Sequence, residues 1–446
     1  MVNIPNSRWH TALRGLLRAL RVATYLLLLA IPLGYLSEAS GWGSLATFSL
    51  FALAIIPLAG LTAFFSDVLI EGTRPRDDRR GRLTLGGAIG AIVDNLSFMI
   101  LGWAALSQGL TQVVQASIAG AIISNTLLVL GLSFFLGTLV GVKQEFDGKR
   151  AKDYAKLLAV IVTAFVLLAF AEAADTQKRN IASDMSVPIA IFLIVLFFAY
   201  IAYEFFHWRR FEDEQKTAPF VEGLNSLLRS SGAGYELKSR FSEQIDDSTL
   251  IRSMNTLLEG SPTDYRLVAM QDESEPPKRR LPLIVALPGL LVVLGLTYLV
   301  SIQLVQVTAQ VVGGTYPITI AGMTLGTIQL SNAFIGLIVI PVIGSAAEHL
   351  NSIHNAMHGK TEAAVNNTAG YAVQITLLAA PILVLISAFF FGSQFTFDFL
   401  PIELAIFGAA TFIFYAVTED GEGTIVEGAA LLVVYAIFAA ATYFFA

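Results

Sequence analysis

The stretch "FIGLIVIPVIGSAAEH", Phe334 to His349, decides the fold. Its first ten residues are all apolar or glycine, and a glutamate and a histidine follow within the next six. In a soluble protein such a run is buried core, whereas in a lipid bilayer it is part of a membrane span. The solvent around the chain therefore determines what Glu348 and His349 do.

The composition indicates a lipid bilayer. Of the 446 residues 55% are hydrophobic and only 14% are charged, whereas soluble domains carry about 25% charged residues. The apolar runs are long enough to cross a hydrocarbon core of ~30 Å as helices. The chain has no cysteine, which excludes disulfides and thiolate metal sites. Rossmann, Walker and nucleic-acid-binding motifs are also lacking, so we expect no cofactor and no nucleic-acid partner.

The runs predict an all-α polytopic membrane protein with eleven transmembrane helices, six before a polar interval and five after it. The predicted spans are 20–37, 44–68, 84–107, 111–140, 154–174, 186–207, 281–303, 322–356, 363–391, 401–417 and 424–446.

Lysine and arginine give the orientation, because they collect in cytoplasmic loops. With these spans, only Lys178 and Arg179 of the 28 basic residues fall on the opposite side from the rest. The N-terminus and the interval 208–280 are therefore predicted to be cytoplasmic and the C-terminus to lie outside. In a prokaryote the membrane would be the cell membrane. The 208–280 interval is nearly neutral and is expected to be a partly helical linker or a regulatory segment.

A weak internal repeat relates the two halves. A shift of 250 residues aligns Asp94–Gly131 with Gly344–Pro381, and Gly109 then matches Gly359. Five spans per copy is an odd number, so the second copy must be inverted relative to the first. The predicted organisation is a leading segment 1–40, a first five-helix repeat 41–207, the cytoplasmic loop 208–280 and a second five-helix repeat 281–446.

Polar residues inside the spans point to a cation site where the repeats face each other. A charge at the bilayer centre costs ~3 kcal/mol and is rarely without function. The candidates are hard oxygen donors, which suit Ca²⁺, Na⁺ or Mg²⁺ better than Zn²⁺ or copper. They are Glu348, Asp94, Asn95, Ser345, Ser124, Asn125 and Gln374. The serines also fit a second interpretation, hydrogen bonding between tightly packed helices.

Two further ionisable residues are candidates for a proton path. His349 is adjacent to Glu348, where it would tune the proton affinity of the carboxylate or act as a structural donor. Glu427 lies inside the last predicted span, where it would form a buried pair with another group or act as a proton relay.

Several of these motifs resemble one family. "FIGLIVIPVIGSAAEH" is similar to the second-repeat signature of the cation/proton exchanger (CAX) family in the Ca²⁺/cation antiporter superfamily, whose core reads G-N-A-A-E-H. "TLGG" (Thr84 to Gly87), "VVQASIAGAIISNTLLVLG" (Val113 to Gly131) and "GYAVQI" (Gly370 to Ile375) resemble other elements of that family. The resemblance implies eleven spans, with one leading helix and two inverted repeats, and exchange of cytoplasmic Ca²⁺ for protons. It assigns cation binding to Glu348 and Asn95.

The first-repeat signature departs from the family pattern. That signature normally reads G-N-A-V-E, whereas this chain has "DNLSF", so Phe98 replaces a glutamate and Asp94 precedes it by one helical turn. Ser345 replaces the second-repeat asparagine. The predicted metal ligands are thus Glu348, Asp94 and Asn95, and the transported ion depends on whether Asp94 faces the same cavity as Glu348.

The leading hypothesis is an antiporter, not an enzyme, that exchanges a cytoplasmic cation, foremost Ca²⁺, for protons. With one carboxylate in the site, Na⁺/H⁺ or K⁺/H⁺ exchange becomes the alternative, because a lone carboxylate matches a monovalent charge. A relative that has lost transport and acts as a sensor or scaffold is a third hypothesis. An intramembrane metalloprotease is disfavoured, since "EHLNSIH" spaces its histidines five apart.

Overall fold

A computed structural model describes residues 26–72, 90, 92–174, 181–202, 283–320, 323–392 and 395–445. The chain divides into two compact units, one formed by Met1–Ala199 with Pro282–Ala446 and the other by Tyr200–Leu281. Everything below concerns the first unit. The predicted loop 208–280 and the start of the predicted leading span lie outside the described residues.

The described residues of the first half form helices and one short strand, β1 (Gln144–Glu145). Its helices are η1 (Leu27–Leu29), α2 (Ala30–Ser40), α3 (Ser44–Gly72), α5 (Leu96–Ser107), α6 (Thr111–Ile123), η2 (Ser124–Val129), α7 (Leu130–Leu139), α8 (Gly148–Ala174) and Ile181–Ala202.

The second half opens with α12 (Leu283–Val311) and the strands β2 (Thr315–Ile320) and β3 (Met323–Gln329). A short strand β4 (Glu422–Gly423) later pairs with β1 in antiparallel register. The remaining helices are α13 (Asn332–Phe334), η3 (Ile335–Val339), α14 (Ile340–Gly344), α15 (Ala346–Met357), α16 (Thr361–Gln374), η4 (Ile375–Ala379), α17 (Ala380–Phe390), α18 (Pro401–Val417) and α19 (Ile425–Phe445).

Apolar length supports the membrane assignment. Among the described residues seven helices are long and apolar enough to cross a membrane, and the bent pair Asn332–Gly344 with Ala346–Met357 makes an eighth. Shorter apolar helices are Leu27–Ser40, Leu96–Ser107 and Pro401–Val417. The predicted spans 111–140, 363–391, 401–417 and 424–446 match helices to within a few residues.

The predicted span 322–356 is wrong at its start. Residues Met323–Gln329 form strand β3, which pairs with β2 in a hairpin. The sequences "TYPITI" and "MTLGTIQ" are rich in threonine and isoleucine, which favour strands. The helix begins only at Asn332, where the Ser331 hydroxyl accepts a hydrogen bond from the Phe334 N–H at 3.0 Å and caps the first turn.

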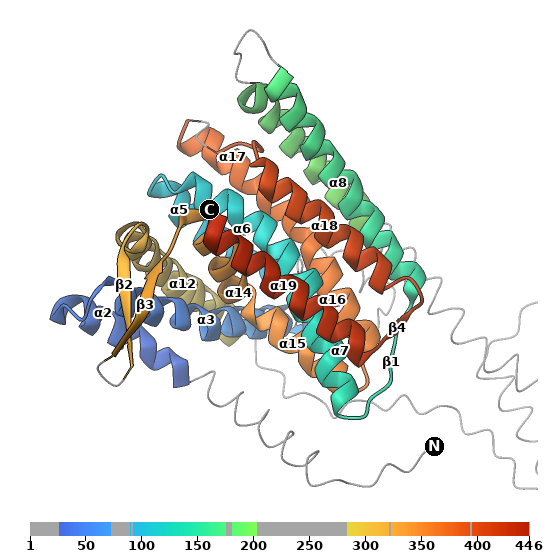
Figure 1. The fold of residues 1–446 in the computed structure, drawn as a ribbon, viewed down its shortest axis with the longest axis horizontal. Coiled ribbons are helices and arrows are strands. Elements are labelled where there is room, and N and C mark those ends of the chain that lie inside the picture. Colours follow the sequence, from blue (N-terminus) through green and yellow to red (C-terminus); the bar gives the residue numbers. More distant parts are fainter. Residues whose placement is uncertain are drawn as a thin grey trace, which may run out of the picture. The chain divides into compact units, whose positions relative to one another are not determined.

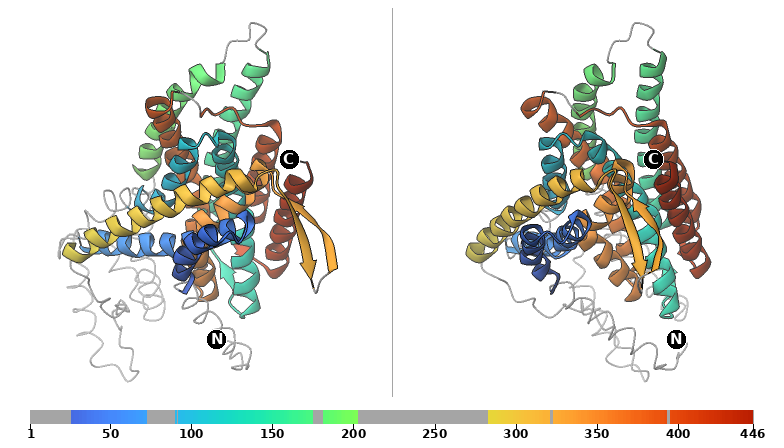
Figure 2. Two further views of the ribbon diagram at one scale, coloured as in Figure 1. Left: turned by 90° about the vertical axis from the view of Figure 1, so that its left-hand side faces the viewer. Right: turned by 60° about the vertical axis from the view of Figure 1, so that its left-hand side comes forward.

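Long helices from the two halves pack side by side. Helix α12 runs along α3 (Figure 2). Helix α19 packs on α7 and α18 on α8 (Figure 1). Elements η3 and α14 pack between α6 and α3, and α15 contacts α16, α7 and α3. The segment "FIGLIVIPVIGSAAEH" is thus surrounded by elements of both halves.

The 250-residue shift found in the sequence also relates elements of the structure. Helices α5 and α15 begin 250 residues apart and end 250 residues apart. Each is followed by a glycine with a left-handed backbone, Gly109 (φ 74°) and Gly359 (φ 78°). Each of the next helices, α6 and α16, continues into a π-helical turn, η2 and η4. Such turns are rare and occur mainly at functional sites.

The matching helices end at opposite ends of the long helix Thr111–Leu139. Helix α5 leads through Leu110 into the start of that helix. The end of α15 lies instead near the other end of that helix. Gln144, which follows Leu139 in the chain, donates a hydrogen bond from its Nε2 to the Ala356 carbonyl of α15 at 3.2 Å. Equivalent segments of the two halves therefore run toward opposite ends of the same helix.

The closest approach between the halves occurs at glycines. A Cβ on Gly120 of α6 would lie 2.6 Å from the Leu337 carbonyl carbon and 2.6 Å from Pro341 Cγ. A Cβ on Gly336 of η3 would lie 2.6 Å from the Val113 carbonyl oxygen. Only glycine allows these two backbones to approach this closely.

We expect Gly120→Ala to destabilise the folded protein by about 1–3 kcal/mol or to prevent folding, because the added methyl overpacks a backbone contact. Gly60→Ala on α3 is the control, since nothing lies within 4 Å of its Cβ position. That control should be neutral or slightly stabilising, because alanine is the better helix former. Thermal unfolding in detergent measures both, and equal melting temperatures for the two variants would contradict the packing argument.

Candidate functional site

The site is built where two helices break. Asn95 precedes α5 and Ser345 precedes α15, and both residues are fully buried. At Ser345 the chain bends by 61° between Asn332–Gly344 and Ala346–Met357. Ordinary hydrogen bonds flank this bend, since the Ser345 N–H donates to the Pro341 carbonyl at 3.1 Å and its own carbonyl accepts from the His349 N–H at 3.0 Å. A bend in mid-span is tolerated here because protein surrounds it.

The structure brings Asp94 and Glu348 together. Asp94 directly precedes the first break, and its Oδ1 accepts a hydrogen bond from the Ser66 hydroxyl of α3 at 3.3 Å. Glu348 lies in the first turn of α15, where the helix dipole favours a negative charge. Its Oε2 is buried without a hydrogen-bond partner among the described residues. The two carboxylates are close enough to interact electrostatically.

Neutral oxygens surround this pair. The Asn95 side-chain amide donates to Gln374 Oε1 at 3.1 Å, which joins the first break to α16. The Ser345 hydroxyl is buried and has no partner within the described ranges. Five of the predicted site residues, Asp94, Asn95, Ser345, Glu348 and Gln374, thus come together around the two breaks.

Ser124 and Asn125 are buried in η2, which packs against α15 and α16. Their donor groups are used within their own helix. The Ser124 hydroxyl donates to the Ala121 carbonyl at 3.2 Å, and the Asn125 amide donates to the same carbonyl at 2.7 Å. Their oxygens remain candidates for the cation, while their N–H and O–H groups stabilise the π-helical turn.

The two proton-path candidates lie in different settings. His349 is 6% exposed, and its Nε2 has no hydrogen-bond partner in the part of the chain that the structure describes. Glu427 lies in the first turn of α19, where its Oε2 accepts from both the N–H and the hydroxyl of Thr424 at 2.8 Å. Glu427 therefore caps a helix, and its role in proton transfer stays a prediction.

Phe98 occupies the place one turn after Asp94. Its side chain is 1% exposed, and a Cβ on Gly344 would lie 3.6 Å from its Cδ2. The ring therefore packs beside the second break and contributes an apolar wall to the site.

Sequence reasoning missed Tyr371 and Ser66. Tyr371 of α16 is 4% exposed, and its hydroxyl lies beside the Ser345 side chain. The signal was its position three residues before Gln374, which puts both side chains on the same face of α16. Ser66 was not detectable from α3 alone, because buried serines in membrane helices usually bond to their own backbone.

The donor set suits a hard cation. Two carboxylates and several amide or hydroxyl oxygens are the ligands that Ca²⁺ and Mg²⁺ prefer. No group of three or more His, Cys, Asp or Glu residues that would hold a metal ion occurs in the described residues. Asp94 and Glu348 are the two carboxylates of this donor set.

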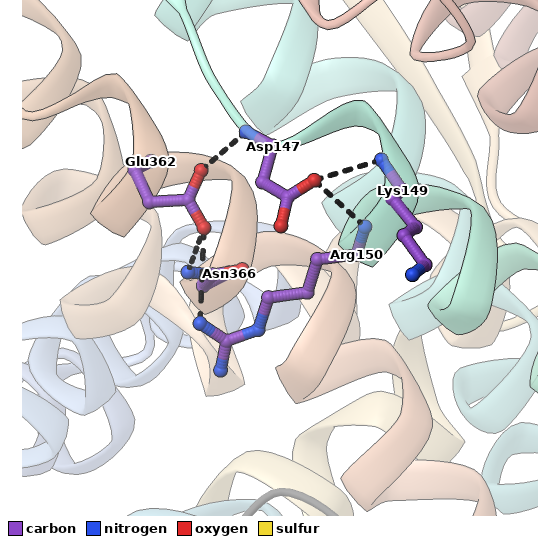
Figure 3. A network of polar contacts seen from close by, with 5 residues as sticks. All are labelled: Asp147, Lys149, Arg150, Glu362 and Asn366. Carbon is purple, nitrogen blue, oxygen red and sulfur yellow. Dashed lines mark hydrogen bonds and ion pairs between the residues drawn. The ribbon is translucent and has the colours of Figure 1, made fainter. Parts of the chain in front are cut away.

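A polar network holds α16 and its site residues in place (Figure 3). Glu362, in the first turn of α16, accepts from the Asp147 N–H at 2.6 Å and the Asn366 amide at 2.8 Å. Its carboxylate also pairs with Arg150 at 3.7 Å. Asp147 in turn caps α8 by accepting from the Lys149 N–H at 2.9 Å. The network fixes the start of α16 to the start of α8.

We expect Glu362→Ala to lower stability by about 1–2 kcal/mol, since it removes two hydrogen bonds and an ion pair from a half-exposed carboxylate. The control is Lys156→Ala, which breaks only the exposed pair with Asp153 at 2.9 Å and should cost at most about 0.5 kcal/mol. Melting temperatures of the purified proteins distinguish the two. A similar small shift for both variants would show that the network contributes little.

The known proteins that this chain resembles are cation exchangers and antiporters. A family model described as sodium/calcium exchanger protein matches residues 46–206 and 283–444. The Ca²⁺/H⁺ antiporter of Aphanothece halophytica is 28% identical over 419 residues, covering 94% of this chain and 95% of that protein. The vacuolar cation/proton exchanger 3 of Arabidopsis thaliana is 26% identical over 424 residues, covering 93% of this chain and 77% of that protein.

The fold is also similar to a solved structure. The structure of native YfkE superposes with a TM-score of 0.65 at 24% sequence identity, covering 94% of this chain and 99% of that chain. The likeness shows that the two chains share a fold.

Proposed function

Because the chain belongs to the sodium/calcium exchanger protein family, we propose that it is a secondary active antiporter that exchanges cytoplasmic Ca²⁺ for protons by alternating access. The observation that carries the proposal is the pairing of Asp94 and Glu348 at two buried helix breaks. The antiporter and exchanger names of the relatives support it. Transport of this kind needs no catalytic residue and no cofactor.

Charge balance favours a divalent ion. Two carboxylates neutralise one Ca²⁺ or accept two protons, so either cargo leaves the site nearly neutral. A divalent ion opposite a single carboxylate would retain an uncompensated charge in a low dielectric, which is costly. Since cation and protons compete for the same oxygens, the entry of one releases the other.

Asp94 takes the role of the acidic residue that Phe98 replaces. The two positions differ by one helical turn, about 5–6 Å along the axis. The hydrogen bond from Ser66 holds the Asp94 carboxylate from the side of α3. Glu348 comes from the opposite break, and Asn95, Gln374, Ser345, Ser124 and Asn125 supply the neutral oxygens around the pair.

The proposed architecture is a leading segment 1–40 followed by two inverted five-helix repeats, 41–207 and 281–446, with eleven spans in all. The matched bounds of α5 and α15 and the π-helical turns η2 and η4 support the repeat. The distribution of basic residues supports a cytoplasmic N-terminus and loop 208–280, with the C-terminus outside.

We expect proteoliposomes with an imposed pH gradient to take up ⁴⁵Ca²⁺, and Glu348→Gln to abolish the uptake. Asp94→Asn should lower the apparent Ca²⁺ affinity by ~10-fold or more, because a divalent ion opposite one carboxylate keeps an uncompensated charge in a low dielectric. Asp184→Asn, at an exposed position, is the matched control and should transport like the wild type.

Other ions define the opposing outcomes. Uptake of Na⁺ or K⁺ that needs Glu348 but not Asp94 would contradict Ca²⁺/H⁺ exchange and support monovalent cation/proton exchange. Absence of uptake for Ca²⁺, Na⁺ and K⁺ by folded wild-type protein would reject the transporter function and favour a sensor or scaffold.

A further inference from the structure

A phenol lies in the cation site without an assigned role. Tyr371 of α16 is 4% exposed, and its hydroxyl lies beside the Ser345 side chain but makes no hydrogen bond of good geometry among the residues that the structure describes. Leaving a buried hydroxyl unpaired is costly, so such groups in native proteins call for an explanation. A ligand that binds next to the hydroxyl would provide one.

The surroundings of this hydroxyl are those of a cation ligand. It lies beside the Ser345 side chain and within electrostatic reach of both Glu348 and Asp94. Glu348 Oε2 is likewise buried without a hydrogen-bond partner among the described residues. Side chains from α15, α16 and the break at Ser345 thus interact with one another at this place.

Tyr435 provides an informative contrast. It is also a buried tyrosine whose hydroxyl has no partner in the described ranges. It lies on α19, however, and no electrostatic interaction with Asp94 or Glu348 is found for it in the part of the chain that the structure describes. Burial without a partner is therefore common to both phenols, and proximity to the two carboxylates is specific to Tyr371.

The number of oxygens also favours Tyr371 as a ligand. Ca²⁺ takes six to eight oxygen ligands. Of the neutral groups at the two breaks, Gln374 Oε1 already accepts a hydrogen bond from Asn95, which leaves it less available. A phenol adds an oxygen without adding charge, so the balance between a divalent ion and the two carboxylates is kept.

We propose that the Tyr371 hydroxyl is a neutral oxygen ligand of the transported divalent cation and sets the affinity of the site for it. This inference rests on the proposed function, because it assigns a residue of the same site. With protons bound instead of a cation, the same hydroxyl is free to donate to the carboxylates, so it serves both states of the site without changing its own charge.

Tyr371→Phe tests the proposal, because it removes only the hydroxyl and keeps the ring that fills the space. The expected result is a rise of about tenfold in the Ca²⁺ concentration for half-maximal ⁴⁵Ca²⁺ uptake, with the maximal rate changed by less than about twofold. Equilibrium ⁴⁵Ca²⁺ binding to the purified protein in detergent should weaken by a similar factor. Tyr435→Phe, the matched control, should leave both values unchanged.

The outcomes separate this inference from the proposed function. Wild-type uptake with an unchanged half-maximal concentration in Tyr371→Phe would overturn the role of Tyr371 and leave the antiporter intact. Ca²⁺ binding that depends on Tyr371 without any uptake would support the ligand and reject the antiporter. An equal loss of affinity in Tyr371→Phe and Tyr435→Phe would mean a general packing effect and would also overturn the proposal.

A structure of the wild type with Ca²⁺ gives an independent measurement, which holds even if the variant fails to fold. The proposal requires the Tyr371 oxygen to lie about 2.3–2.6 Å from the ion. A Ca²⁺ ion between Asp94 and Glu348 with the phenol more than about 4 Å away would overturn it.

Discussion

The structure depends on one constraint, that backbone polar groups in a bilayer must be hydrogen-bonded inside the protein. A helix that breaks in mid-span violates this constraint unless other helices enclose the break. Here the breaks at Asn95 and Ser345 are both fully buried. Enclosing them requires close packing from both halves, and the glycine contacts between α6 and η3 allow it. Helices of the two halves also pack in pairs, α3 with α12, α7 with α19 and α8 with α18.

The same breaks determine the chemistry. Residues at the start of α5 and α15 experience the positive end of a helix dipole, which favours carboxylates there. Glu348 lies in the first turn of α15, Asp94 lies directly before the break at Asn95, and Asn95, Ser345 and Gln374 are close by. An enclosed break thus allows polar groups that would be a defect elsewhere in the membrane, and these are the groups of the proposed cation site.

Much of this was predictable from the sequence, and the failures have physical causes. Length and hydropathy located most described spans, and "GSAAEH" indicated candidate site residues because ionisable groups are costly inside an apolar run. The bend at Ser345 was not predicted, since the stretch was assigned to one continuous span. The predicted span began too early, at 322, because "MTLGTIQ" is apolar enough to be taken for part of a membrane helix. Its threonines and isoleucine favour a strand, which is what these residues form. Tyr371 and Ser66 were missed because a buried tyrosine or serine in a helix is usually packing. Only tertiary contacts reveal that each lies next to a carboxylate.

The two halves are complementary at the site, not identical. Under the 250-residue shift Asp94 matches Gly344, Phe98 matches Glu348, and Ala121 matches Tyr371. Each carboxylate thus corresponds to a residue without charge in the other half, and Phe98 packs beside Gly344, the counterpart of Asp94. The site still has two carboxylates, as in the family signature. The first-half carboxylate, Asp94, lies one helical turn before Phe98 and next to Ser66 of α3, and the second, Glu348, lies near Tyr371. In the exchanger proposed above, the two halves would therefore contribute unequal ligands to the cation, Asp94 with Asn95 from the first half and Glu348 with Gln374 from the second.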